Sequence, residues 1–117
     1  MDVDVLFVGV AVTDFGQAQA WYERFFGRAP DVVAHETEVM WRVRDAGWLY
    51  ILRDPEHAGS SFAALAVSDL EAATAELIAR GVETGSIEAE GEGALKALVR
   101  DPDGNLLSLL EVAAGGG

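Results

Sequence analysis

The chain has 117 residues, half of them hydrophobic, which is enough to bury the core of one domain and argues against disorder. Eight basic residues against twenty acidic ones give a formal charge of −12, which repels phosphate backbones and anionic lipid, so neither nucleic acid nor a membrane is expected as a partner. There is no cysteine, which excludes disulfides, thiolate metal sites and a cysteine nucleophile and fits a cytoplasmic location.

The first half of the chain predicts one strand, one helix and three further strands. Acidic residues at the amino terminus stand where a signal peptide would carry basic ones, and residues 5–12 then form an apolar, β-branched run that is typical of a strand. Asp14 and Gln17 have the spacing of a capping box, and Gly27 is placed to end the helix that they begin. Three short extended segments follow: residues 31–36, 39–44 and 48–53.

After a polar linker at residues 55–60, the same order of elements starts again. A strand at 62–67 leads into a helix at 69–80, in which Ser68 and Glu71 are spaced as a capping box. The apolar face expected for this helix consists of Leu70, Ala73, Leu77 and Ile78. Three more strands are predicted: residues 82–88, 93–100 and 105–112.

The two halves are an internal repeat, because residues 10–14 (VAVTD) return as residues 65–69 (LAVSD). Each half has the order strand, helix, strand, strand, strand, and a sheet with one helix keeps one face uncovered. We therefore predict an α+β fold in which two tandem βαβββ modules form a curved mixed sheet around a cup. The expected single domain, 1–117, divides as follows: module one at about 4–54, a linker at 55–60, module two at about 61–112 and a flexible tail at 113–117.

Three sequence features together resemble a known superfamily. They are the V-x-V-x-D strand end, the pair Trp21-Tyr22 ahead of Phe26-Gly27, and the sequence DPDGN at residues 101–105 before an apolar strand. This combination resembles the vicinal oxygen chelate superfamily, which includes glyoxalase I, ring-cleaving dioxygenases, fosfomycin resistance proteins and bleomycin resistance proteins. The resemblance covers almost the whole chain and implies paired βαβββ modules whose sheets form a cup, usually in a homodimer.

The positions that hold a metal ion in other members carry the wrong residue types here. In those members, His or Glu on the first strand of each module and an acid on the last strand hold a divalent ion that polarises two substrate oxygens. The resemblance places Phe7, Phe62 and Ser108 at these positions, and Tyr50 or Ile51 at a fourth. Phenyl rings have no lone pair to donate and a lone serine is a poor ligand, so we expect no metal and no other cofactor.

The same positions predict a ligand-binding surface. Strand alternation puts five residues on the faces that the helices leave uncovered: Phe7, Trp48, Tyr50, Phe62 and Ser108. Aromatic rings beside small residues hold flat ligands by stacking, and they hold cations by cation–π attraction, which the acidic net charge would assist. The alternative is that Phe7, Phe62 and Trp48 fill a collapsed cup as core.

Three functional hypotheses follow. The first is a metal-free small-molecule-binding protein without catalytic residues, similar in mode to the bleomycin resistance proteins that confer antibiotic resistance, and homodimeric. The second is a metal-dependent lyase or dioxygenase that uses Tyr50, His35 and Glu36 as unusual ligands, although His35 and His57 lie in different elements and fit surface positions better. The third is an interaction module with a filled cup. The sequence leaves open which ligand binds, and whether the modules pair within one chain or across a dimer.

Overall fold

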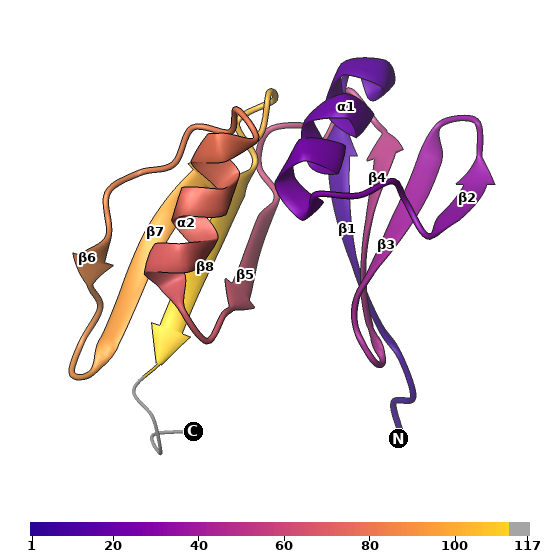
Figure 1. Ribbon diagram of the computed structural model, residues 1–117. Coiled ribbons are helices and arrows are strands. Elements are labelled where there is room, and N and C mark those ends of the chain that lie inside the picture. The colour runs from indigo at the N-terminus through magenta and orange to yellow at the C-terminus, as the bar shows by residue number, and fades with distance from the viewer. Residues whose placement is uncertain (113–117) are drawn as a thin grey trace.

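The computed structural model describes residues 1–112, and the tail predicted at 113–117 lies outside the described residues. It has two four-stranded mixed sheets, each with one helix (Figure 1). The elements are β1 (Leu6–Val12), α1 (Phe15–Phe26), β2 (Val32–His35), β3 (Glu38–Arg44), β4 (Gly47–Arg53), β5 (Phe62–Ala66), α2 (Leu70–Ala79), β6 (Glu88–Ala89), β7 (Ala94–Arg100) and β8 (Leu106–Val112). The predicted α+β class with two tandem modules is therefore confirmed. Within 1–112, neither helix combines the length and the apolar character that crossing a membrane requires.

Both modules have the same strand order. In module one (β1 to β4) the order across the sheet is β1-β4-β3-β2, and in module two (β5 to β8) it is β5-β8-β7-β6. The first strand of each module runs parallel to the last strand, and the remaining neighbours are antiparallel. This equivalence confirms that the repeated sequence motif marks a repeated structural unit.

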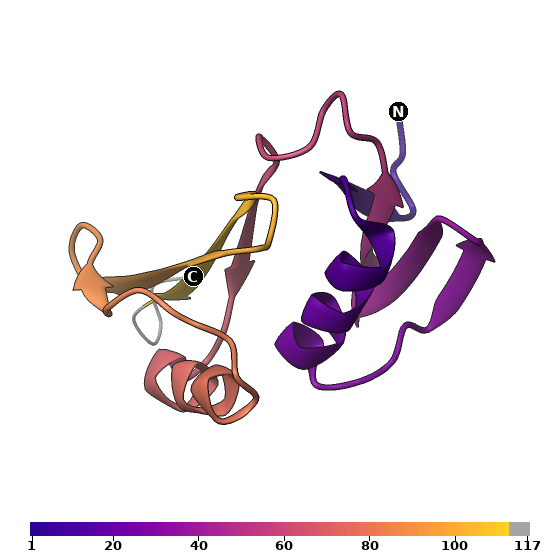
Figure 2. The ribbon, with the colours of Figure 1, turned by 90° about the horizontal axis from the view of Figure 1, so that it is seen from above.

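Each helix covers one face of its own sheet and leaves the other face uncovered. β1 and β4 turn Val10, Val12, Leu49 and Ile51 toward α1, where all four are buried with the helix aromatics Trp21, Tyr22 and Phe25. Seen from above, α1 and α2 lie on the same side of the two sheets (Figure 2). The uncovered face of each sheet, called its open face below, is turned away from the other module.

The ends of α1 are those expected from the sequence. The Asp14 carboxylate accepts a hydrogen bond from the Gln17 N–H at 3.0 Å, which satisfies one of the free donors of the first turn. Gly27 ends the helix with φ of 75°, a left-handed conformation that suits a residue without a side chain. The helix aromatics Trp21, Tyr22 and Phe25 are buried in the core that the helix forms with its sheet.

The start of α2 differs from the prediction. Asp69, not Ser68, is the N-cap, and its carboxylate accepts from the Ala72 N–H at 3.0 Å. A charged cap also interacts favourably with the helix dipole, which a serine hydroxyl does less well. The predicted apolar face is wrong at one position, because Ile78 is 62% exposed while Thr74 is buried between Leu70 and Leu77.

The strand predicted at 82–88 is also wrong in extent, because β6 has only two residues. The segment before it is held by other contacts: the Val82 N–H donates to Leu77 O at 2.9 Å and closes the end of α2. Val82 is buried, and Gly85 donates to Leu98 O. The segment therefore follows the second sheet without extending its regular ladder.

The DPDGN sequence forms a buried hub that joins the two modules. The Tyr22 hydroxyl of α1 donates to Asp101 Oδ2 at 2.8 Å, and Asn105 Nδ2 donates to the Ala11 carbonyl of β1 at 2.8 Å. Asn105 Oδ1 accepts from the backbone N–H groups of Gly59, in the linker, and of Ser61, just after it, at 3.0 and 2.9 Å. Burial and the neighbouring Asp101 charge raise the pKa of Tyr22 well above its ordinary value, so the phenol stays a donor. The motif thus acts as a structural brace.

A second contact between the modules joins the two helices. The Arg80 side chain, just after α2, donates from Nε to the Arg24 carbonyl and from Nη2 to the Phe25 carbonyl at 2.9 Å. A cation at the carboxyl end of a helix satisfies free carbonyls and interacts favourably with the helix dipole. Module two therefore caps the last turn of α1 in module one.

Candidate functional site

Three of the predicted site residues meet on the open face of module one. Phe7 on β1 pairs directly with Trp48 on β4, and their rings stack with centroids 6.2 Å apart and planes inclined by 28°. Trp48 and Tyr50 lie opposite in phase to Leu49 and Ile51, which are buried under α1. Phe7 is 51% exposed, so this stack is an accessible surface and does not fill the core.

Tyr50 lies across the backbone of β1 because its partner there is glycine. Gly9 pairs with Tyr50, and a Cβ added at Gly9 would come within 2.5 Å of Tyr50 Cζ and Oη. The missing side chain therefore makes room for the phenol ring. The result is a floor of three neighbouring aromatic rings, those of Phe7, Trp48 and Tyr50.

The other two predicted site residues lie on the open face of module two. Phe62 and Ser108 line a hollow of about 350 Å³ together with apolar residues of β5, β7 and β8: Ala64, Leu98, Leu106 and Leu110. Ser108 is buried at the base of this hollow, whereas Phe62 at the edge is 65% exposed. The exposure of Phe7 and Phe62 argues against the alternative in which the aromatic residues form a collapsed core.

A charged pair at the same hollow is absent from the sequence-based prediction. Lys96 on β7 and Glu90 after β6 also line the hollow, and Lys96 Nζ lies 2.6 Å from Glu90 Oε2. The hydrogen bond that Lys96 donates to Glu90, together with the negative charge of Glu90, raises the pKa of Lys96. The alternation of Lys96 with the buried residues Ala97 and Val99 was the signal that could have placed it on the open face.

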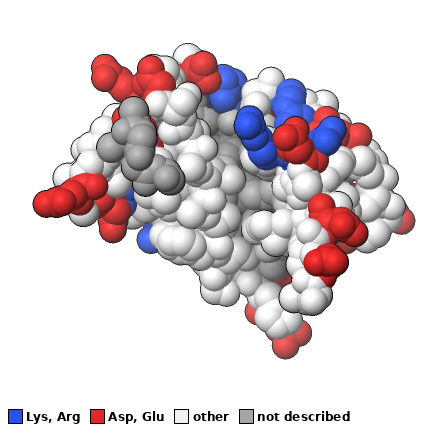
Figure 3. Space-filling view, turned by 90° about the horizontal axis from the view of Figure 1, so that it is seen from below, with Lys and Arg blue, Asp and Glu red and all other residues white. Residues whose placement is uncertain are grey.

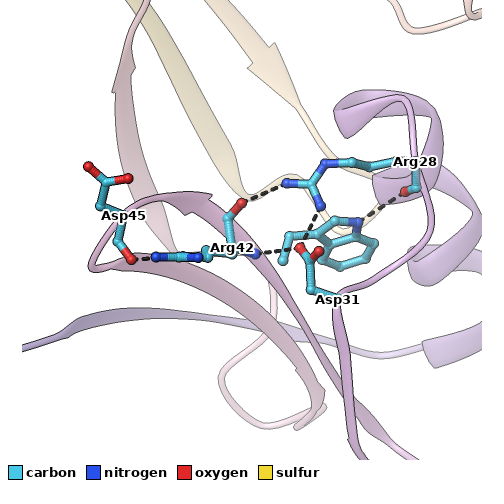
Figure 4. Close-up of polar contacts among 5 residues, drawn as sticks. Arg28, Asp31, Arg42 and Asp45 are labelled. Atoms are coloured by element: carbon cyan, nitrogen blue, oxygen red, sulfur yellow. Dashed lines mark hydrogen bonds and ion pairs between the residues drawn. The ribbon is translucent and has the colours of Figure 1, made fainter.

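Arg42 on β3 belongs to a local network that anchors the segment after α1 (Figure 4). Asp31 accepts from the Arg28 guanidinium and from the Arg42 N–H, while Arg42 Nε donates to the Asp45 carbonyl at 2.8 Å. The hydrogen bond from Arg28 lowers the pKa of Asp31. The pairing register shifts between Arg42 and Arg44, so these two arginines do not share one face of the strand, as simple alternation would otherwise require.

The residues at the superfamily's metal-binding positions do not fit a metal ion. Phe7, Phe62 and Ser108 lie on open faces but offer one hydroxyl among them, and Ile51 is buried under α1. His35 Nε2 lies 3.5 Å from Glu38 and His57 Nδ1 lies 2.8 Å from Asp54, both at exposed positions on different elements. In the described part of the chain, no three His, Cys, Asp or Glu side chains come together in a way that could hold a metal. The metal-free state itself stays a prediction.

Comparison with known proteins agrees with this architecture. A family model described as "Glyoxalase/Bleomycin resistance protein/Dioxygenase superfamily" matches residues 5–109. The crystal structure of a glyoxalase / bleomycin resistance protein from Catenulispora acidiphila DSM 44928 is 42% identical, with a TM-score of 0.87 over 92% of this chain and 97% of that one.

Two further solved structures share the fold at lower identity. The antibiotic binding protein TnmS3 from Streptomyces sp. CB03234 is 24% identical, with a TM-score of 0.76, covering 96% of this chain and 98% of that one. A bleomycin resistance determinant encoded on the transposon Tn5 is also 24% identical, with a TM-score of 0.77 and coverage of 94% and 98%. No curated protein matches the chain significantly.

Proposed function

The chain belongs to the glyoxalase/bleomycin resistance protein/dioxygenase superfamily, and from this premise we propose that it is a metal-free protein that binds a planar small molecule without transforming it. The observation that carries the proposal is the aromatic floor of Phe7, Trp48 and Tyr50, in which the resemblance places Phe7 and Tyr50 at positions where metal-using members carry ligand residues. Stacked, accessible rings bind flat molecules, and of these three side chains only the Tyr50 phenol carries an oxygen that could act as a nucleophile or a metal ligand.

Cationic aromatic compounds are the first ligands to test. The formal charge of −12 attracts cations, and each ring face of the Phe7–Trp48 stack adds cation–π attraction at short range. Two structural relatives are described as an antibiotic binding protein and a bleomycin resistance determinant, which supports a role in sequestering an antibiotic. The lack of cysteine is consistent with action in the cytoplasm.

We also propose that the binding cup is completed by a second copy of the chain. The open faces of the two modules are turned away from each other, and each exposes apolar side chains, Phe7 on one and Phe62 on the other. Exposed apolar residues of this kind are typical of surfaces that a partner covers. In a two-fold dimer, module one of one chain would face module two of the other, and Trp48 and Ser108 would then line one cup.

Tryptophan fluorescence tests the binding proposal. Titration with a panel of planar cations should quench the emission saturably, and the change should be lost in Trp48→Phe because Trp48 is the tryptophan on the open face. Trp41 is buried under α1 and should not respond. Absence of saturable binding across a broad panel would contradict the proposal. Light scattering should give twice the mass of one chain, and a monomer would contradict the shared cup.

The alternative from the sequence is a metal-dependent lyase or dioxygenase that uses Tyr50, His35 and Glu36. The structure favours it less, because His35 and Glu36 lie at exposed positions around the β2–β3 turn, where His35 is already beside Glu38. Elemental analysis of the dialysed protein tests it directly. A stoichiometric metal that is lost in Tyr50→Phe would establish the alternative and overturn the metal-free proposal.

A further inference from the structure

A cleft of about 590 Å³ lies between the two modules on the side of the helices. Its module-one wall comes from the end of α1 and the end of β3, and its module-two wall from β5 and α2. The larger apolar side chains on these walls include Phe25, Phe26, Val43, Leu65, Val67 and Leu77. Its volume is in the range of small-molecule sites, about 300–1,000 Å³. None of the five residues predicted for the cup lines it, although Ala64 also lines the hollow of module two, and Arg44 and Ala64 also border a smaller hollow beside Trp48 and Phe62.

Three charged side chains line the cleft, and only one of them remains available to a ligand. Arg80 already donates to the carbonyls at the end of α1, and Glu76 precedes it by one helical turn, so their charges offset each other. Arg44 stands on the opposite wall, brought there by the shift in strand register after Arg42. Over residues 1–112, Arg44 takes part in none of the four ion pairs, which involve other side chains.

The positive charge around this cleft contrasts with the acidity of the whole chain. Of the charged side chains that line the cleft, two are basic (Arg44 and Arg80) and one is acidic (Glu76), whereas acidic residues outnumber basic ones by twenty to eight in the whole chain. Viewed from below, Lys and Arg side chains gather beside the hollow between the modules, with an acidic group among them and further acidic side chains around the periphery (Figure 3). A ligand with a negative head group is therefore favoured at this end of the cleft, even though the net charge of −12 favours cations elsewhere.

From this arrangement we propose that the cleft is a second ligand site, and that it binds a single-chain amphiphile with one carboxylate. The apolar chain would lie between Phe26 and Leu77, and the carboxylate would accept hydrogen bonds from the Arg44 guanidinium. A planar guanidinium is well suited to this task, because it offers two parallel donors to a carboxylate and stays charged at any physiological pH. This inference does not depend on the function proposed for the open faces.

Calorimetric titration of the full-length chain with decanoate tests the proposal. We expect saturable binding of one decanoate per chain, and about tenfold weaker binding to Arg44→Gln, which loses one charge-assisted contact. Ala73, which lines the cleft from α2, is replaced in Ala73→Leu to fill the space, and this variant should lose binding. Ala72→Leu is the matched control, because it adds the same side chain on the exposed side of the same helix and should bind normally.

Two comparisons separate this site from the open faces. Decyltrimethylammonium has the same chain with a cationic head, and it should bind at least tenfold more weakly than decanoate. Trp48→Ala alters the open face and should leave decanoate binding unchanged. Equal binding of the two amphiphiles, unchanged binding to Arg44→Gln, or loss of binding in Trp48→Ala would each overturn the proposal. Arg44 is exposed, so the Arg44→Gln result stands even if Ala73→Leu fails to fold.

Discussion

Replacing the buried Asn105 by alanine should lower the free energy of unfolding more than replacing an exposed polar side chain by alanine. The side chain is fully buried and makes four hydrogen bonds: its amide donates to Ala11 O and to Asp101 Oδ2, and its oxygen accepts from the N–H groups of Gly59 and Ser61. Alanine would leave the Ala11 carbonyl and the N–H groups of Gly59 and Ser61 without their partner. Each unsatisfied buried group costs about 1–3 kcal/mol, and water can reach the half-buried linker, so we expect a loss of about 3–5 kcal/mol.

Urea unfolding followed by circular dichroism measures this loss. The free energy of unfolding of a small domain is about 5–15 kcal/mol, so the midpoint should fall by a large fraction of its value. Ser60→Ala is the matched control, because its exposed hydroxyl makes only a long contact of 3.4 Å to His57 O, and its effect should stay within about 0.5 kcal/mol. A loss below about 1 kcal/mol in Asn105→Ala would refute the role of this residue as a brace between the modules.

Two further predictions concern the site and its surroundings. Gly9→Ala should displace the Tyr50 ring and lower the stability by about 1–3 kcal/mol, whereas Gly16→Ala, whose added Cβ has no neighbour nearer than 3.8 Å, should be neutral or stabilising; equal unfolding midpoints would contradict this. The hydrogen bond from Arg28 lowers the pKa of Asp31 below 3.8, so its contribution to stability is present above that pH and is lost as the pH falls through the lowered pKa. Carboxyl NMR should show Asp31 titrating closer to 3.8 in Arg28→Gln, and identical curves in the two proteins would count against the assigned cause.

Local signals in the sequence predicted most of the fold. The caps of α1 depend on residues three positions apart or at the end of the helix, so Asp14 and Gly27 were identifiable without knowing the rest of the chain. The repeated five-residue motif indicated the two modules because its two copies can be recognised by comparing the halves of the sequence directly. These features depend on residue type and short spacing, which a single sequence records directly.

The predictions were wrong where two neighbouring residues could each cap a helix, or where contacts between residues far apart in the sequence determine the course of the backbone. Ser68 and Asp69 are both good caps, and the chain uses the charged one. Residues 82–87 have a strand-like composition, but the buried Val82 and its bond to Leu77 determine their course. The role of Asn105 was equally hidden, because its partners at Ala11 and Gly59 are 94 and 46 residues away.

Strand alternation predicted which residues share an open face, but not how the two open faces lie relative to each other. Alternation along each strand correctly grouped Trp48 with Tyr50, away from Leu49 and Ile51, because side chains change face at every residue. It could not predict that the two open faces turn away from each other. That orientation depends on contacts between the modules, such as the hydrogen bonds from Arg80 to the end of α1. Such contacts produce no repeating pattern in the sequence from which they could be predicted.

The two modules share one strand order, but matching positions on their open faces carry different residues. Phe7 and Phe62 occupy matching positions, but the residue beside each is Trp48 in one copy and Leu106 in the other. One step along, the neighbours are Tyr50 and Ser108. A flat ligand bound between two such faces would contact aromatic rings of module one on one side, and aliphatic side chains and one hydroxyl group of module two on the other. Its two sides would therefore not be equivalent, and it would bind in one orientation.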